Sequence, residues 1–137
     1  MIDHPRIRVV AAALYDSAGR VLIAERPAGK HMAGRWEFPG GKVAPGEGDE
    51  AALRRELKEE LGIEMLAARR LMTLTHQYAD LSVELSLWIA AGFRGEARSL
   101  DGQRLKWVEP EALGTEDILE ADRPFVEALQ ALGRPGR

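Results

Sequence analysis

The sequence predicts an α/β fold in which a mixed β-sheet lies between helices. In residues 81–89 an aliphatic side chain occupies every second position, which is typical of a strand with one buried face. Residues 49–61 and 123–132 repeat their apolar side chains with the period of an amphipathic helix. Strands that alternate with two substantial helices favour a sheet covered on both faces.

The N-terminal part of the chain reads as strands joined by turns. Residues 7–15 are apolar and rich in valine and alanine, and residues 16–19 (Asp-Ser-Ala-Gly) supply a turn before residues 21–25. This pattern predicts a β-hairpin. A loop is expected over residues 26–35, because it holds one proline and two glycines, and a short strand follows at residues 36–38.

A loop and a helix come next. Glycines and a proline interrupt residues 40–48 too often for regular structure. Gly48 or Asp49 can then cap a helix, and Gly62 ends it at a position that favours a left-handed residue.

The remaining elements are predicted from the same signals. In chain order they are a strand at residues 65–78 with an irregularity at 67–69, a turn at 79–80, the strand at 81–89, a loop at 92–103, a strand at 104–108, a helical turn at 110–113, a helix at 123–132 that Asp122 can cap, and a tail at 133–137.

Length and composition limit the classes of function. One hundred and thirty-seven residues with 45% hydrophobic content fit one domain spanning residues 1–137. A formal charge of −3 gives no basic field for a nucleic-acid polymer, and the absence of cysteine excludes disulfides and thiol catalysis. No apolar run approaches the length of a membrane span, so we expect a cytoplasmic protein without a membrane partner.

The helix at residues 49–61 carries an unusual acidic border. Its apolar face is formed by Leu53, Leu57 and Leu61. Glu56 and Glu60 lie one turn apart at the edge of this face, and Glu59 lies beside them. Like charges at this spacing cost about 0.2–0.5 kcal/mol, and desolvation adds to the cost. Arg55 alone cannot neutralise them, so the hard oxygen ligands predict Mg²⁺, with Mn²⁺ as an alternative.

A solvated acidic helix face is the other interpretation of such a charge run. The spacing decides between the two. Gly41 is followed after five residues by Glu47, and after seven more by Arg-Glu-Leu-x-Glu-Glu-x-Gly-Ile, which ends at Ile63. Residues 41–63 thus carry the complete Nudix box, and the chain resembles the Nudix hydrolases. Residues 31–42 resemble the lead-in of MutT-type nucleoside triphosphate pyrophosphohydrolases, and the likeness extends over residues 6–132.

The resemblance implies the α/β/α Nudix sandwich and attack of water at an inner phosphorus, with release of a nucleoside monophosphate and pyrophosphate. Implied metal ligands are Glu56, Glu59, Glu60 and the backbone carbonyl of Gly40. Arg55 is implied to orient a glutamate and Glu47 to support the loop. The base is Glu56 or a loop acid, and Asp101 stands where similar proteins have a glutamate. A plain turn at Asp101-Gly102 is the alternative.

Substrate-binding residues are implied by the same resemblance. Arg26 and Phe38 fall on positions that contact the purine in MutT-type enzymes, and Lys42 ends the lead-in. Asp122 falls where those bacterial enzymes have an asparagine, whereas a related subgroup that hydrolyses CTP and modified pyrimidine nucleotides carries aspartate. Capping of the following helix is the other role open to Asp122.

We therefore expect a Mg²⁺-dependent nucleoside triphosphate pyrophosphohydrolase, a monomer or homodimer, that clears oxidised nucleotides such as 8-oxo-dGTP. One alternative keeps this chemistry but prefers CTP or 5-methyl-dCTP. Another is a nucleotide-binding module without activity, which would tolerate the loss of carboxylates that this chain retains. His4, His31 and His76 have no ligand spacing and are expected at the surface.

Overall fold

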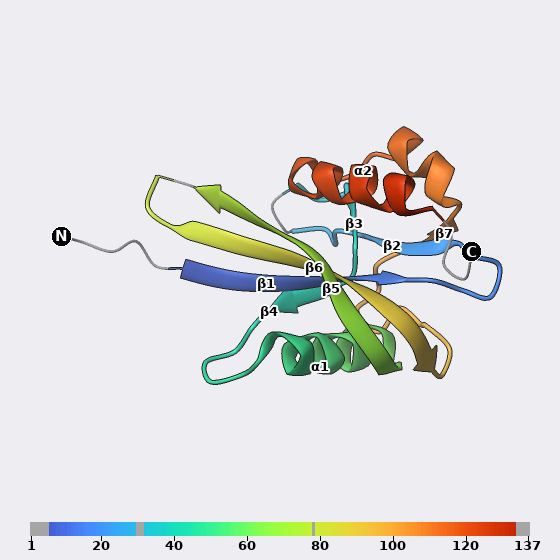
Figure 1. Ribbon diagram of the computed structural model, residues 1–137, viewed down its shortest axis with the longest axis horizontal. Helices are drawn as coiled ribbons and strands as arrows, with labels where there is room; N and C mark the ends of the chain where they lie inside the picture. The colour runs from blue at the N-terminus through green and yellow to red at the C-terminus, as the bar shows by residue number, and fades with distance from the viewer. Residues whose placement is uncertain (1–5, 30–31, 78, 134–137) are drawn as a thin grey trace.

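The computed structural model describes residues 6–29, 32–77 and 79–133 (Figure 1). In chain order its elements are β1 (Arg6–Leu14), β2 (Val21–Glu25), β3 (Trp36–Glu37), β4 (Gly40–Lys42), α1 (Asp49–Leu61), β5 (Glu64–Gln77), β6 (Ser82–Arg94), β7 (Leu105–Val108), the 3₁₀ helices η1 (Pro110–Thr115) and η2 (Glu120–Asp122), and α2 (Arg123–Leu132). Predictions for His4, His31, Tyr78 and residues 134–137 lie outside the described residues. Within those residues, no helix is long and apolar enough to cross a membrane.

The strands form two sheets between the two α-helices. The larger sheet has the order β4-β1-β6-β5 and is mixed, because β1 runs parallel to β6 and antiparallel to β4. The smaller sheet has the order β3-β2-β7 and is antiparallel. Helix α1 lies on one side of the strands and α2 on the other (Figure 1). The predicted arrangement of a mixed sheet between helices is confirmed, with its strands divided between two sheets.

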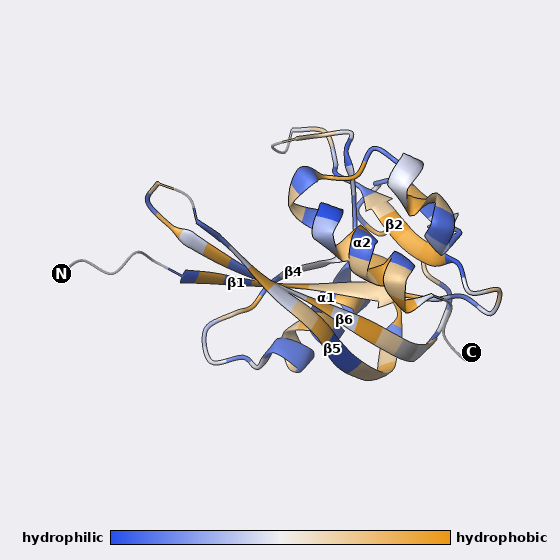
Figure 2. Ribbon diagram, turned by 45° about the horizontal axis from the view of Figure 1, so that its top comes forward, coloured by the Kyte–Doolittle hydropathy of each residue, from blue (hydrophilic) through white to orange (hydrophobic). Residues whose placement is uncertain are grey.

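Two hydrophobic cores hold these layers together. One lies under α1, where its buried leucines pack with Val10 of β1 and Leu22 of β2. The other lies under α2, where Phe125 and Leu129 pack with Ile23 of β2. Strand β2 therefore contributes to both cores, and it is almost uniformly hydrophobic (Figure 2). Burial of apolar area on both faces is the main force that stacks the layers.

The predicted hairpin of residues 7–25 is wrong. Strands β1 and β2 belong to different sheets, and only an isolated bridge between Tyr15 and Val21 connects them. The turn itself forms as expected, with the N–H of Gly19 donating to the carbonyl of Asp16 at 3.0 Å. Both edges of β1 are occupied, by β4 and β6, so β2 has no free edge to pair with and takes β3 and β7 instead.

The loop predicted from residue 40 begins instead as the short strand β4. Its residues pair with β1, Gly40 opposite Ala11 and Lys42 opposite Val9. Gly40 has φ +156°, and a Cβ there would lie 1.9 Å from the carbonyl oxygen of Val10. Glycine is thus required by the closeness of the β1 backbone, and the resulting strand fixes the start of the box.

Helix α1 begins and ends where the sequence predicts. Gly48 is the N-cap residue and makes no side-chain bond, while Gly62 has φ +70° and donates its N–H to the carbonyl of Lys58. The leucine face of α1 is fully buried. Its glutamates are therefore carried by a helix that cannot rotate about its axis without exposing that face.

The long hairpin of β5 and β6 differs from the prediction in extent. Strand β6 continues to Arg94, five residues beyond the expected end at Ile89. Strand β5 has register shifts between Met65 and Ala68, which confirms the expected irregularity, and a further shift between Arg70 and Met72. Such bulges raise the local twist of an edge strand, and the outer half of this hairpin forms one wall of the site.

Candidate active site

One pocket gathers almost every residue that the sequence predicts for the site. It has a volume of about 1050 Å³ and lies between β4 and α1, the segment before β7, and the N-terminus of α2. Of the predicted residues, Arg55 and Glu47 do not line it. The others that line it are Arg26, Phe38, Gly40, Lys42, Glu56, Glu59, Glu60, Asp101 and Asp122.

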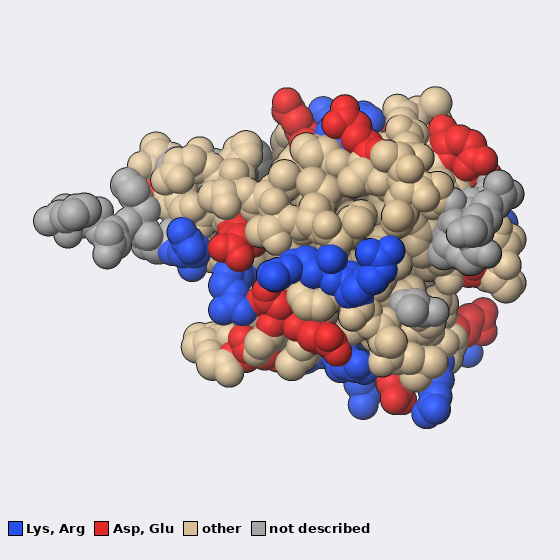
Figure 3. Space-filling view, viewed as in Figure 1, with Lys and Arg blue, Asp and Glu red and all other residues tan. Residues whose placement is uncertain are grey.

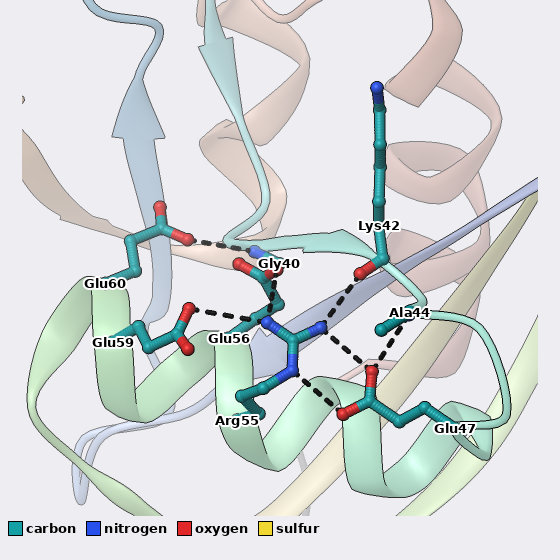
Figure 4. Close-up of polar contacts among 8 residues, drawn as sticks. All are labelled: Gly40, Lys42, Ala44, Glu47, Arg55, Glu56, Glu59 and Glu60. Atoms are coloured by element: carbon teal, nitrogen blue, oxygen red, sulfur yellow. Dashed lines mark hydrogen bonds and ion pairs between the residues drawn. The ribbon is translucent and has the colours of Figure 1, made fainter.

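Arg55 lies behind the pocket and connects its acidic residues (Figure 4). Its guanidinium donates to both carboxylate oxygens of Glu47, at 2.8 and 2.9 Å, and to the carbonyl of Lys42 at 3.0 Å. It also donates to Glu56 at 3.0 Å and to Glu59 at 3.4 Å. One planar donor group thus orients several acceptors at once, which lysine could not do.

Glu47 supports the loop as the resemblance implies. Its Oε1 accepts the backbone N–H of Ala44 at 3.0 Å. The hydrogen bonds from Arg55, and then that from Ala44, lower the pKa of Glu47 to about 2. Glu47 is consequently a fixed anion that holds the loop against α1.

The backbone of β4 leaves space for Glu56. A Cβ at Gly41 would lie 2.4 Å from the Cδ carbon of Glu56. Only glycine therefore allows this carboxylate to rest directly on the strand. Gly41 is thus explained by a side-chain contact, whereas Gly40, directly before the box, is explained by a backbone contact.

Glu60 is partly buried, and two donors approach it. The N–H of Gly40 donates to its Oε2 at 3.4 Å, and the amide of Gln103 donates to its Oε1 at 3.4 Å. Burial is the main reason that the pKa of Glu60 rises to about 7. The charges of Glu37, Glu56 and Asp101 raise this pKa further, and the hydrogen bond from Gly40 lowers it. Negative potential is concentrated at this point.

The donor set suits a hard divalent cation in its chemistry. Carboxylate and carbonyl oxygens are the ligands that Mg²⁺ prefers, and a cation would relieve the repulsion that raises the pKa of Glu60. In the described part of the chain, no group of three or more acidic, histidine or cysteine side chains stands close enough together to hold a metal ion. Glu56 and Glu59 both turn to Arg55, so metal binding requires their side chains, not the helix, to move.

The opposite end of the pocket holds a second acidic centre. Asp122 is only 5% exposed, and its Oδ2 accepts the N–H of Phe38 at 3.2 Å. Its side chain makes no capping bond to α2, so the capping role is wrong. Burial is the main reason that the pKa of Asp122 rises to about 7. The hydrogen bond from Phe38 and the charge of Arg26 lower this pKa, whereas the charge of Glu37 raises it further.

Arg26 and Glu37 lie beside Asp122 in the same pocket. The guanidinium of Arg26 contacts Oε1 of Glu37 at 2.8 Å. Glu37 of β3 pairs with Ala24 of β2, and Arg26 directly follows β2, where its N–H donates to the carbonyl of Arg35 at 2.8 Å.

Sequence reasoning missed three pocket residues. Glu37 was not singled out, although it stands between two buried aromatic residues in a short strand, a pattern that would have placed it on the other face. Gln103 carries no local signal, because its role depends on contacts with α1. His76 is exposed as expected and also lines the pocket wall formed by β5.

The surface around α1 carries charges of both signs. Figure 3 shows acidic and basic side chains intermixed over the part of this face where α1 lies.

Comparison with known proteins places the chain among nucleotide hydrolases. The NUDIX domain model matches residues 5–129. The CTP pyrophosphohydrolase of Escherichia coli K12 is 38% identical, over 90% of this chain and 91% of that protein. The 8-oxo-dGTP diphosphatase of the same organism is 30% identical, over 93% and 98%. The solution structure of the E. coli ORF135 protein has a TM-score of 0.86 at 38% identity and covers 98% of this chain and 96% of that one.

Proposed function

The chain belongs to the NUDIX domain family, and we propose that it is a Mg²⁺-dependent nucleoside triphosphate pyrophosphohydrolase that clears oxidised nucleotides such as 8-oxo-dGTP. Its products are the nucleoside monophosphate and pyrophosphate. The observation that carries the proposal is the meeting, in one pocket, of the α1 glutamates with the buried acid Asp122. A phosphate chain requires the first, and a base edge with hydrogen-bond donors requires the second.

At the phosphate end, the ligands would be Glu56, Glu59, Glu60 and the carbonyl of Gly40. Bound Mg²⁺ neutralises phosphate charge and lowers the pKa of a coordinated water. Lys42 lines the same pocket, and its side chain extends away from α1 (Figure 4), which leaves its ammonium group available to phosphate oxygens.

Glu56 is our candidate for the base that accepts the proton of the attacking water. Helix α1 carries its carboxylate into the pocket, where Arg55 donates to it at 3.0 Å, whereas Asp101 is exposed in a loop. A base must be positioned before its pKa matters. Asp101 is the alternative, and Asp101→Asn decides between them, since this variant loses most of kcat only if Asp101 is the base.

At the base end, Asp122 and Glu37 supply acceptors beside the buried ring of Phe38. Guanine and 8-oxoguanine offer ring and amino N–H donors to such acceptors, and cytosine offers its amino group. Aspartate at position 122 favours one further candidate, hydrolysis of CTP or 5-methyl-dCTP. The relative at 38% identity is named a CTP pyrophosphohydrolase, which supports the same candidate.

Steady-state kinetics on 8-oxo-dGTP, dGTP, CTP and 5-methyl-dCTP with saturating Mg²⁺ tests the proposal. The highest kcat/KM is expected for 8-oxo-dGTP, and a higher value for either cytosine nucleotide would transfer the assignment to the alternative. Tight nucleotide binding without turnover on any of the four would identify a binding module and end the enzymatic proposal.

A further inference from the structure

The segment of residues 98–103 is attached to the last turn of α1. The N–H of Arg98 donates to the carbonyl of Leu61 at 3.0 Å, and the N–H of Leu100 donates to the carbonyl of Glu60 at 3.1 Å. Carbonyls in the last turn of a helix lack partners within the helix. The segment satisfies two of them, so its position is determined by the same helix that carries the glutamates.

Gln103 ends this segment and is buried, with 6% of its surface exposed. Its Nε2 donates to Oε1 of Glu60 at 3.4 Å, while its Oε1 accepts the hydroxyl of Ser99 at 2.9 Å. An ionised carboxylate can only accept hydrogen bonds, so the amide must turn its NH₂ group toward Glu60. Ser99 then fixes the other end of the amide in that orientation.

Glu60 is consequently held from two sides. Gln103 approaches one carboxylate oxygen and the N–H of Gly40 approaches the other, each at 3.4 Å. A carboxylate has about four acceptor sites, so both oxygens retain sites for a cation. The two donors stop the Glu60 side chain from turning away from the pocket, and they leave part of its acceptor sites free.

We propose that Gln103, oriented by Ser99, is a positioning residue that keeps the Glu60 carboxylate directed at the metal. The inference rests on the proposed function, because it takes Glu60 to be a metal ligand. Residues that hydrogen-bond to metal ligands commonly affect metal affinity almost as strongly as the ligands do. Gln103 also connects the loop that carries Asp101 with helix α1. Asp101 and Glu60 are therefore held in a fixed position relative to each other.

Gln103→Met removes the donor at nearly constant shape, and Ser99→Ala releases the amide without touching Glu60. Gln130→Met is the matched control, since the Gln130 amide also makes a partly buried bond, to the carbonyl of Pro110 at 3.3 Å, outside the pocket lining. Mn²⁺ affinity of the substrate-free protein is measured by electron paramagnetic resonance, and Tm is measured in EDTA.

Gln103→Met should weaken Mn²⁺ binding about tenfold, and Ser99→Ala should weaken it by a smaller factor, while Gln130→Met leaves it unchanged. A purely structural role would lower the Tm in EDTA without changing Mn²⁺ affinity. Unchanged affinity in Gln103→Met, or in Ser99→Ala if the first variant does not fold, overturns the inference. If the wild-type protein itself binds no Mn²⁺, the proposed function fails and the inference fails with it.

Discussion

Replacement of Asp122 by asparagine should make the protein more stable at neutral pH. Burial raises the pKa of Asp122 from 3.8 to about 7. The native state therefore binds more protons than the unfolded state between these values, and stability falls as the pH rises from about 4 to about 7. At about 1.4 kcal/mol for each pH unit, the free energy of unfolding falls by about 4 kcal/mol over this range. Asparagine does not ionise, and its amide oxygen still accepts the N–H of Phe38.

Urea unfolding of the wild type and of Asp122→Asn at about pH 5 and about pH 8 tests this reasoning, because the two values lie within and above the titration window. The advantage of the variant should grow with pH by a few kcal/mol. Asp117→Asn is the control, since that aspartate is exposed and pairs with Arg35 at the surface. A difference between Asp122→Asn and wild type that stays constant with pH would refute the assignment of a buried, raised-pKa acid.

Four further predictions concern two glycines of β4 and two residues of α1. Gly40→Ala should destabilise the fold by about 3 kcal/mol or more, because its Cβ meets the backbone of β1. Gly41→Ala should change the free energy of unfolding by only about 1 kcal/mol. It should nevertheless lower kcat/KM, since its Cβ displaces the carboxylate of Glu56. Equal unfolding midpoints in urea for Gly40→Ala and Gly41→Ala would contradict the expected difference in stability. Arg55→Met should lower the Tm and reduce kcat/KM about 10- to 100-fold, because the hydrogen bonds of Arg55 to Glu47, Glu56 and Glu59 are lost. Glu59→Gln should reduce kcat/KM about 100-fold or more with little change in Tm, and a full rate would exclude Glu59 from the metal site.

Local signals were sufficient to predict helix α1 and the residues it presents. Its capping glycines, its leucine face and the border of glutamates all lie within one short stretch of chain, so the period and the end signals agree. Packing of the leucine face determines which glutamates face the pocket. For this reason the stretch that carries the family signature also predicts acidic residues that line the pocket.

Pairing of distant strands could not be predicted in the same way. The expected hairpin failed because β1 pairs with β6, which lies about seventy residues later in the chain. The sequence predicts a loop in place of β4 because glycine has a low strand propensity, whereas the extended form of β4 is imposed by the neighbouring backbone of β1. Gln103 was missed for a related reason, since its partners are brought to it only by the folded loop.

Product identification with and without metal tests the central claim most directly. 8-oxo-dGTP and CTP are incubated with the protein and Mg²⁺, and the products are identified by ³¹P NMR. We predict equal amounts of nucleoside monophosphate and pyrophosphate, and no turnover after EDTA treatment. Release of orthophosphate with a nucleoside diphosphate, or hydrolysis that continues at the same rate in EDTA, would contradict the account.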